Sequence, residues 1–166
     1  MRLDHWIKQL FILPGAVFAF VLVRPILSTD LVFRLIKGFL ATCFIASSNY
    51  VINEWLDAEF DKYHPVKKHR SVVENNMNAH IVYALYFGLA ATGLWIGFFS
   101  KKVFGMLVWL WVMGVFYNVK PFRTKDVPFV DVLTESINNA IRLLIGWFII
   151  IDNYLPPVSI VIGYWF

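Results

Sequence analysis

The residues best suited to chemistry lie between positions 53 and 61, where acidic side chains recur in an otherwise apolar sequence. Asn53, Asp57 and Asp61 follow one another at intervals of four residues. On an α-helix this interval turns the side chain by only about 40° per step, so all three can point toward one spot. Mg²⁺ binds oxygen ligands and is commonly held by one or two carboxylates together with substrate phosphates. The spacing therefore predicts one half of a magnesium site.

A second polar set lies in a later apolar segment. Asp131, Glu135, Asn138 and Arg142 follow at intervals of four, three and four residues, which places them on one face of a helix. Ionisable residues in a membrane helix are costly and usually face a cavity or a partner. We expect Asp131 and Glu135 to complete the magnesium site. Arg142 either contacts substrate or pairs with Glu135 or Asn138.

Basic residues follow the first acidic set and precede the second. They include Lys67 and Arg70 in one loop, and Lys120 and Arg123 in another. Arginine binds phosphate through a bidentate fork and lysine as a point charge. A subset of these cations is therefore expected to bind a diphosphate. The alternative is the excess of Lys and Arg that cytoplasmic loops carry without any ligand.

The composition indicates that these sets belong to a membrane protein. The chain is 59% hydrophobic and 16% charged, with a mean hydropathy of +0.63. Soluble domains are roughly 45–50% apolar and about 25% charged. The single cysteine, Cys43, cannot form an intrachain disulfide and has no metal-ligand spacing. The first apolar run has no signal-peptide cleavage pattern and is interpreted as a membrane helix. No nucleic-acid partner is expected.

An all-α, multi-span transmembrane bundle follows from the apolar segments, with residues 1–166 as a single domain. Ser28 to Asp30 is expected to form a turn and helix N-cap, and His64-Pro65 to interrupt the helix before it. Pro156-Pro157 is expected to open a sixth helix that ends before it could cross a bilayer. We therefore expect the N-terminal part of a longer bundle. The five complete spans are expected near residues 9–27, 31–53, 79–99, 103–119 and 129–151.

The distribution of Lys and Arg predicts the orientation. Nine of these residues lie at the N-terminus and in the loops at 62–70 and 120–125, and five lie on the opposite side. This difference places both loops in the cytoplasm of a bacterial-type cell membrane. Both acidic sets then lie on the same side, which suggests one site built from two halves.

Two motifs in this order resemble the UbiA superfamily of intramembrane prenyltransferases. The signature N-x-x-x-D-x-x-x-D matches Asn53, Asp57 and Asp61. A Y-x-x-K segment at residues 117–120, followed by an acidic pair at 131 and 135, resembles the second signature. The resemblance covers most of the chain and implies a Mg²⁺-dependent transferase with a polyprenyl lipid substrate in the bilayer. It also implies more membrane helices than this chain contains.

Within that superfamily, the H-P-x-K-x-x-R segment at residues 64–70 is most similar to the branch that transfers phosphoribose to polyprenyl phosphate. That branch uses phosphoribosyl diphosphate as donor and decaprenyl phosphate as acceptor. Glu135 departs from the usual Asp but keeps the carboxylate. The resemblance implies these metal-binding and catalytic residues: Asp57, Asp61, Asp131 and Glu135. The candidate residues for binding substrate or diphosphate are Asn53, His64, Lys67, Arg70, Tyr117, Lys120, Arg123 and Arg142.

Three alternatives remain open at this point. One is prenylation of an aromatic quinone precursor, in which the lipid rather than the sugar carries the diphosphate. Another is a protein without enzymatic activity, either an inactive remnant or a partner subunit. A transporter is the third, because polar stripes also line transport pathways.

Overall fold

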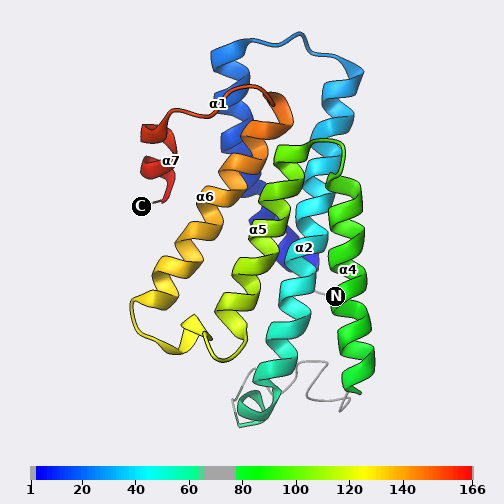
Figure 1. The fold of residues 1–166 in the computed structure, drawn as a ribbon, viewed down its shortest axis with the longest axis vertical. Helices are drawn as coiled ribbons and strands as arrows, with labels where there is room; N and C mark the ends of the chain where they lie inside the picture. Colours follow the sequence, from blue (N-terminus) through cyan, green and yellow to red (C-terminus); the bar gives the residue numbers. More distant parts are fainter. Residues whose placement is uncertain (1–2, 64, 66–77, 166) are drawn as a thin grey trace.

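The structure is a computed structural model that describes residues 3–63, 65 and 78–165, with only the backbone of residues 3–5. All regular elements in these residues are helices (Figure 1). The chain begins with a 3₁₀ segment that continues directly into α1, and a short 3₁₀ turn precedes α6. In chain order the elements are η1 (Leu3–Ile12), α1 (Leu13–Val23), α2 (Thr29–Asp61), α4 (Ala79–Gly97), α5 (Lys101–Asn118), η3 (Thr124–Asp126), α6 (Val130–Ile150) and α7 (Val158–Trp165).

Three of these helices have a small polar side chain as their N-cap. Ser28 accepts a hydrogen bond from the Leu31 amide at 3.2 Å, which confirms the turn and N-cap expected at residues 28–30. Ser100 caps α5 in the same way, and Asn78 caps α4. Each cap satisfies an amide that has no partner within its helix. The helix expected after Pro157 is present as α7.

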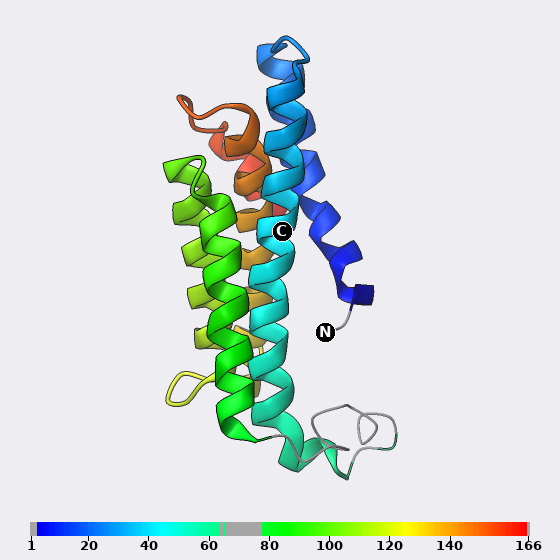
Figure 2. The same cartoon turned by 90° about the vertical axis from the view of Figure 1, so that its right-hand side faces the viewer.

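Helix α2 is the longest element and lies among α4, α5 and α6, with which it packs (Figure 1). Helix α1 packs on α6, and α7 lies against α6 as well. The direction of the helices brings the end of α2, the end of α5 and the start of α6 to one end of the bundle (Figures 1 and 2). The two acidic sets of the sequence therefore lie at the same end.

Among the residues that the structure describes, three helical segments are long and apolar enough to cross a membrane: Trp6–Val23, Thr29–Asp61 and Ala79–Gly97. The expected count of five spans stays a prediction. The polar stripe on α6 lowers the hydropathy of that helix. Large apolar side chains lie exposed on the outer faces of α1 and α4, among them Val21, Phe87 and Trp95. Such faces suit contact with lipid chains, which need no polar partner.

Two glycines allow α1 and α6 to approach closely. A Cβ at Gly15 would collide with the backbone carbonyl of Leu143, and a Cβ at Gly146 would collide with that of Ile12. Small residues at such crossings let membrane helices pack backbone to backbone. Since α1 follows directly from η1, this contact also fixes the position of η1.

Replacement of Gly15 by alanine is expected to destabilise the protein by about 1–3 kcal/mol, because backbone atoms must move to admit the methyl group. Thermal unfolding of the purified protein in detergent measures the effect. Gly105→Ala is the matched control, since nothing lies within 4 Å of a Cβ at that exposed position of α5. Equal melting temperatures for the two variants would contradict the close α1–α6 contact.

Candidate functional site

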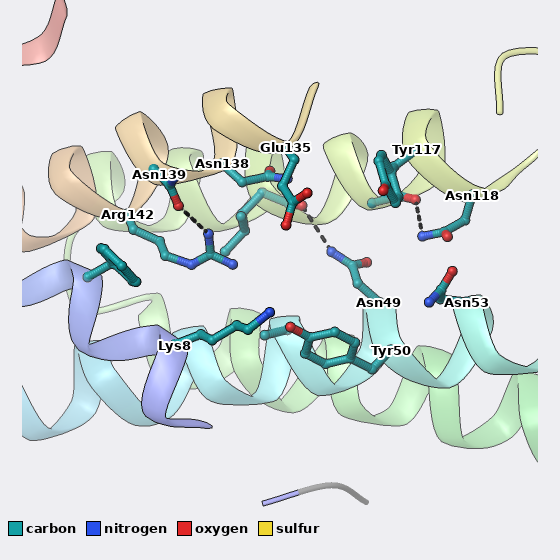
Figure 3. Close-up of a pocket in the computed structure, with 14 residues that line it drawn as sticks. Lys8, Asn49, Tyr50, Asn53, Tyr117, Asn118, Glu135, Asn138, Asn139 and Arg142 are labelled. Atoms are coloured by element: carbon teal, nitrogen blue, oxygen red, sulfur yellow. Dashed lines mark hydrogen bonds between the residues drawn. The ribbon is translucent and has the colours of Figure 1, made fainter. Parts of the chain in front are cut away.

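A cavity of about 300 Å³ lies between η1, α2, α5 and α6 (Figure 3). Ten of its fourteen lining residues are polar, although the helices that carry them are otherwise largely apolar. The side chains of Lys8, Glu135 and Arg142 extend into the space between the helices (Figure 3). The polar lining residues are Lys8, Asn49, Tyr50, Asn53, Tyr117, Asn118, Glu135, Asn138, Asn139 and Arg142.

The wall between α2 and α5 depends on a glycine. Asn49 donates a hydrogen bond from its side-chain amide to the Leu110 carbonyl at 3.1 Å. A Cβ at Gly114 would collide with the Asn49 amide group, so only glycine leaves room for this contact. Asn53 lies one helical turn further along α2 and also lines the cavity. The α2 residues that line the cavity therefore share one face of the helix: Ala46, Asn49, Tyr50 and Asn53.

Arg142 is held by neighbours other than those expected from its spacing. Its Nε donates to Gln9 Oε1 at 2.9 Å, and its Nη1 donates to Asn139 Oδ1 at 3.3 Å. These two hydrogen bonds of the guanidinium go to Gln9 and Asn139, and its pairing with Glu135 or Asn138 stays a prediction. The crossing of η1 over α6 brings the fully buried Gln9 to Arg142. A substrate contact by Arg142 stays a prediction.

We call the end of the bundle where α2 and α5 end and α6 begins the motif end. There, two cations bind one carboxylate oxygen. Arg123 Nη2 lies 2.9 Å from Asp57 Oδ1, and Lys125 Nζ lies 2.7 Å from the same oxygen. The side chains of Arg123 and Lys125 are only 13% and 11% exposed, so water screens these ion pairs weakly. Arg123 Nε also donates to Asp126 Oδ2 at 2.6 Å. This cluster connects the loop before α6 to α2.

Lys125 makes two further hydrogen bonds, to Asn53 Oδ1 at 2.8 Å and to Asn118 Oδ1 at 3.1 Å. Burial lowers the pKa of the Lys125 ammonium, and its hydrogen bond to Asp57 acts in the opposite direction. Asn53 and Asn118 also line the cavity, so the ion cluster adjoins the cavity through these two side chains. We therefore treat the cavity and the adjoining ion cluster together as the candidate site.

The acidic residues predicted to bind metal are spread over this end of the bundle. Asp61 is buried at the end of α2, and Asp131 is half-buried in the first turn of α6. Glu135 is exposed and lines the cavity. In the part of the chain that the structure describes, no three acidic, His or Cys side chains are gathered as a preformed metal site. The oxygen donors fit Mg²⁺, which commonly completes its coordination with water and substrate phosphate.

Other predicted residues have mixed placements. His64, Lys67 and Arg70 lie outside the described residues. Tyr117 lines the cavity, whereas Lys120 is exposed on the loop. The structure adds residues that motif reasoning missed. Lys125 had a signal, because it lies in the same basic loop as Arg123; the others that it adds are Lys8, Gln9, Asn49, Tyr50, Asn118 and Asn139.

Helices long and apolar enough to cross a membrane, beside a cavity with a polar lining, are typical of a membrane-embedded protein. Residues 11–166 match the UbiA prenyltransferase family. The chain belongs to this family, and the resemblance found from the two motifs is confirmed.

Three curated relatives are similar over much of the chain. Decaprenyl-phosphate phosphoribosyltransferases from Corynebacterium glutamicum and Mycolicibacterium smegmatis are 23% and 27% identical over 88% of it. A lycopene elongase/hydratase from Haloarcula japonica is 28% identical over 70% of it. These alignments cover 43%, 45% and 39% of the respective relatives. The chain therefore spans less than half the length of these relatives.

The fold is also that of known structures. A UbiA homologue from Archaeoglobus fulgidus, bound to DMAPP and Mg²⁺, superposes with a TM-score of 0.81 at 19% sequence identity. The superposition covers 98% of this chain and 57% of the homologue. A second structure, described as a UbiA homologue from the same organism bound to GPP and Mg²⁺, has the same score. The similarity establishes the fold.

Replacing Gln9 with leucine is expected to destabilise the protein by about 1–3 kcal/mol, because the half-buried Arg142 guanidinium loses an acceptor. Gln9→Glu keeps an acceptor at this position and is expected to lose less. Thermal unfolding of both variants in detergent tests the contact. A leucine variant as stable as the wild type would show that the bond between η1 and α6 contributes nothing.

Proposed function

We propose that this chain carries the polar site of a Mg²⁺-dependent transferase that moves 5-phosphoribose from phosphoribosyl diphosphate to a polyprenyl phosphate. The observation that carries this proposal is the polar lining of the cavity between η1, α2, α5 and α6. A prenyl chain needs an apolar surface, whereas a sugar phosphate needs donors and acceptors for its hydroxyl and phosphate oxygens. The two phosphoribosyltransferase relatives support the same substrate class.

The charges at the motif end suit the departing group. In the proposed reaction an oxygen of the polyprenyl phosphate forms a bond with the anomeric carbon of the ribose. The bond from that carbon to the diphosphate breaks, and the diphosphate leaves with the electron pair. Negative charge therefore develops beside Arg123 and Lys125, and cations placed in advance stabilise such charge without reorganisation.

The carboxylates have a complementary role. Asp57 and Asp61 on α2, and Asp131 and Glu135 on α6, are the residues that would hold Mg²⁺ with the diphosphate between the two helices. When bound, the metal supplies neutralisation of charge on the leaving diphosphate. Lys8 and Arg142 line the cavity beyond this position, where they can orient the polar group that enters it.

Prenyl transfer to an acceptor is the second candidate. The lycopene elongase/hydratase relative and the homologues bound to DMAPP and GPP favour it. In this case the lipid carries the diphosphate, and the cavity receives the polar part of the acceptor, an aromatic quinone precursor. The two candidates use the same charge cluster and differ in which substrate brings the diphosphate.

Membranes that contain the complete polypeptide are expected to convert labelled phosphoribosyl diphosphate and decaprenyl phosphate into lipid-linked phosphoribose. Asp57→Asn and Asp131→Asn are each expected to reduce this rate by about a hundredfold or more, because each removes a carboxylate from the proposed metal site. Chromatography of the extracted lipid measures the product. Protein level and membrane insertion are measured in the same samples.

A matched control is Asp30→Asn, which removes an exposed carboxylate from the first turn of α2, at the opposite end of the bundle. It is expected to retain the rate. Labelled geranylgeranyl diphosphate with an aromatic acid is offered in parallel. If prenylated aromatic product forms and lipid phosphoribose does not, the second candidate replaces the first.

A further inference from the structure

The ammonium of Lys125 lies inside a set of three oxygen atoms. Asp57 Oδ1 and Asn53 Oδ1 on α2 lie at 2.7 and 2.8 Å from Nζ, and Asn118 Oδ1 on α5 lies at 3.1 Å. A lysine ammonium has three N–H donors, so these three acceptors use all of them. We call the three oxygens the oxygen cage.

The cage is built into the helices rather than formed by mobile surface groups. Asn118 is buried and donates from its own amide to the Gly114 carbonyl at 2.9 Å, which directs its oxygen toward Lys125. Asn53 and Asp57 are one turn apart on α2. Arg123 also contacts Asp57, through the same Oδ1 that Lys125 contacts.

These contacts conflict with the role proposed for Asp57. Divalent cations bind carboxylate oxygens at about 2.0–2.6 Å, well inside the distance at which Lys125 now binds. A metal ion and an ammonium on the same oxygen would be only a few ångströms apart. At such distances like charges repel strongly in a weakly screened site. The cage therefore binds a divalent cation only weakly while Lys125 occupies it.

We propose that Lys125 is a built-in counter-cation that holds the oxygen cage in the ligand-free protein and leaves it only when a diphosphate arrives with the metal. This inference rests on the proposed function, because it assumes that diphosphate and metal bind at this end of the bundle. Phosphate oxygens carry negative charge, as the Asp57 carboxylate does. The ammonium can therefore exchange the acceptors of the cage for phosphate oxygens and stay paired with an anion. Metal and diphosphate then increase each other's affinity by the same factor.

Such a device has a consequence for binding order. The carboxylate is never left without a cation, and the lysine is never left without an anion. A divalent cation that binds Asp57 without diphosphate lies close to the Lys125 ammonium, and the two positive charges repel each other. Diphosphate alone does not neutralise Asp57 once Lys125 has moved. The pair binds together more favourably than either component alone.

Binding of Mn²⁺, used as the probe for the divalent cation, tests the proposal on the complete polypeptide in detergent. Equilibrium dialysis at matched free Mn²⁺ is performed with and without inorganic pyrophosphate. The wild type is expected to bind Mn²⁺ at least about tenfold more tightly when pyrophosphate is present. Lys125→Met, which keeps the length of the chain without its charge, is expected to bind Mn²⁺ alone about tenfold more tightly than the wild type.

Three variants locate the effect. Lys62→Met removes an exposed charge at the same end of α2 and is expected to behave as wild type. Lys125→Arg keeps the charge and is expected to keep the requirement for pyrophosphate. In the double variant Asp57→Asn with Lys125→Met, the gain in affinity for Mn²⁺ alone is expected to disappear, since the cage has lost its carboxylate.

Two results would overturn the proposal. One is a wild type that binds Mn²⁺ equally with and without pyrophosphate. The other is a Lys125→Met variant that binds Mn²⁺ alone no more tightly than Lys62→Met, which would leave Lys125 a purely structural contact. A wild type with the expected Mn²⁺ behaviour but no transfer of phosphoribose would overturn the proposed function and leave the counter-cation intact.

Discussion

Polar groups inside an apolar bundle must satisfy one another, because lipid provides neither hydrogen bonds nor counter-ions. This constraint organises the structure. Helix α6 carries a polar stripe, and the polar turns of α2 and α5 face the same cavity. A helix with such a stripe is stable in a membrane only if the stripe faces inward. The arrangement of α2, α5 and α6 thus places polar residues from three helices in one cavity.

The same constraint explains why the far end of the stripe differs from the motif end. Arg142 is fixed by Gln9 and Asn139, two neutral partners, at the crossing of η1 and α6. Asp57 is instead compensated by two cations from a loop. Neutral partners hold a guanidinium in place without cancelling its charge. The two cations neutralise the charge of the Asp57 carboxylate, so it attracts a further cation only weakly until one of them moves.

The sequence predicted the features that depend on local chemistry. The cap at Ser28, the helix after Pro157 and the polar face of α6 all follow from residue type and spacing. The two motifs also identified the family. Spacing along one helix could not identify Gln9 as a partner of Arg142, because Gln9 lies 133 residues away in the sequence and meets Arg142 only where η1 crosses α6.

The contacts of Lys125 could not be predicted from the sequence for a related reason. The basic loop before α6 contains three cations close together in the sequence: Lys120, Arg123 and Lys125. The sequence alone does not say which of them turns toward α2. The structure distinguishes them by their acceptors: Lys125 and Arg123 reach Asp57, whereas Lys120 is exposed. Which cation is selected depends on the path of the loop between α5 and η3. A helical pattern carries no information about that path.

The charge cluster also clarifies how one fold can serve donors as different as a sugar diphosphate and a prenyl diphosphate. In the proposed function, Arg123, Lys125 and Asp57 act on a diphosphate and its metal, which both kinds of donor would share. Discrimination must then come from the groups beyond the diphosphate. In this chain those groups are the amides and charges of η1, α2 and α6 that line the cavity. A hydroxyl-bearing group can satisfy them, whereas an isoprenoid chain would bury them without partners at a cost of about 1–3 kcal/mol each.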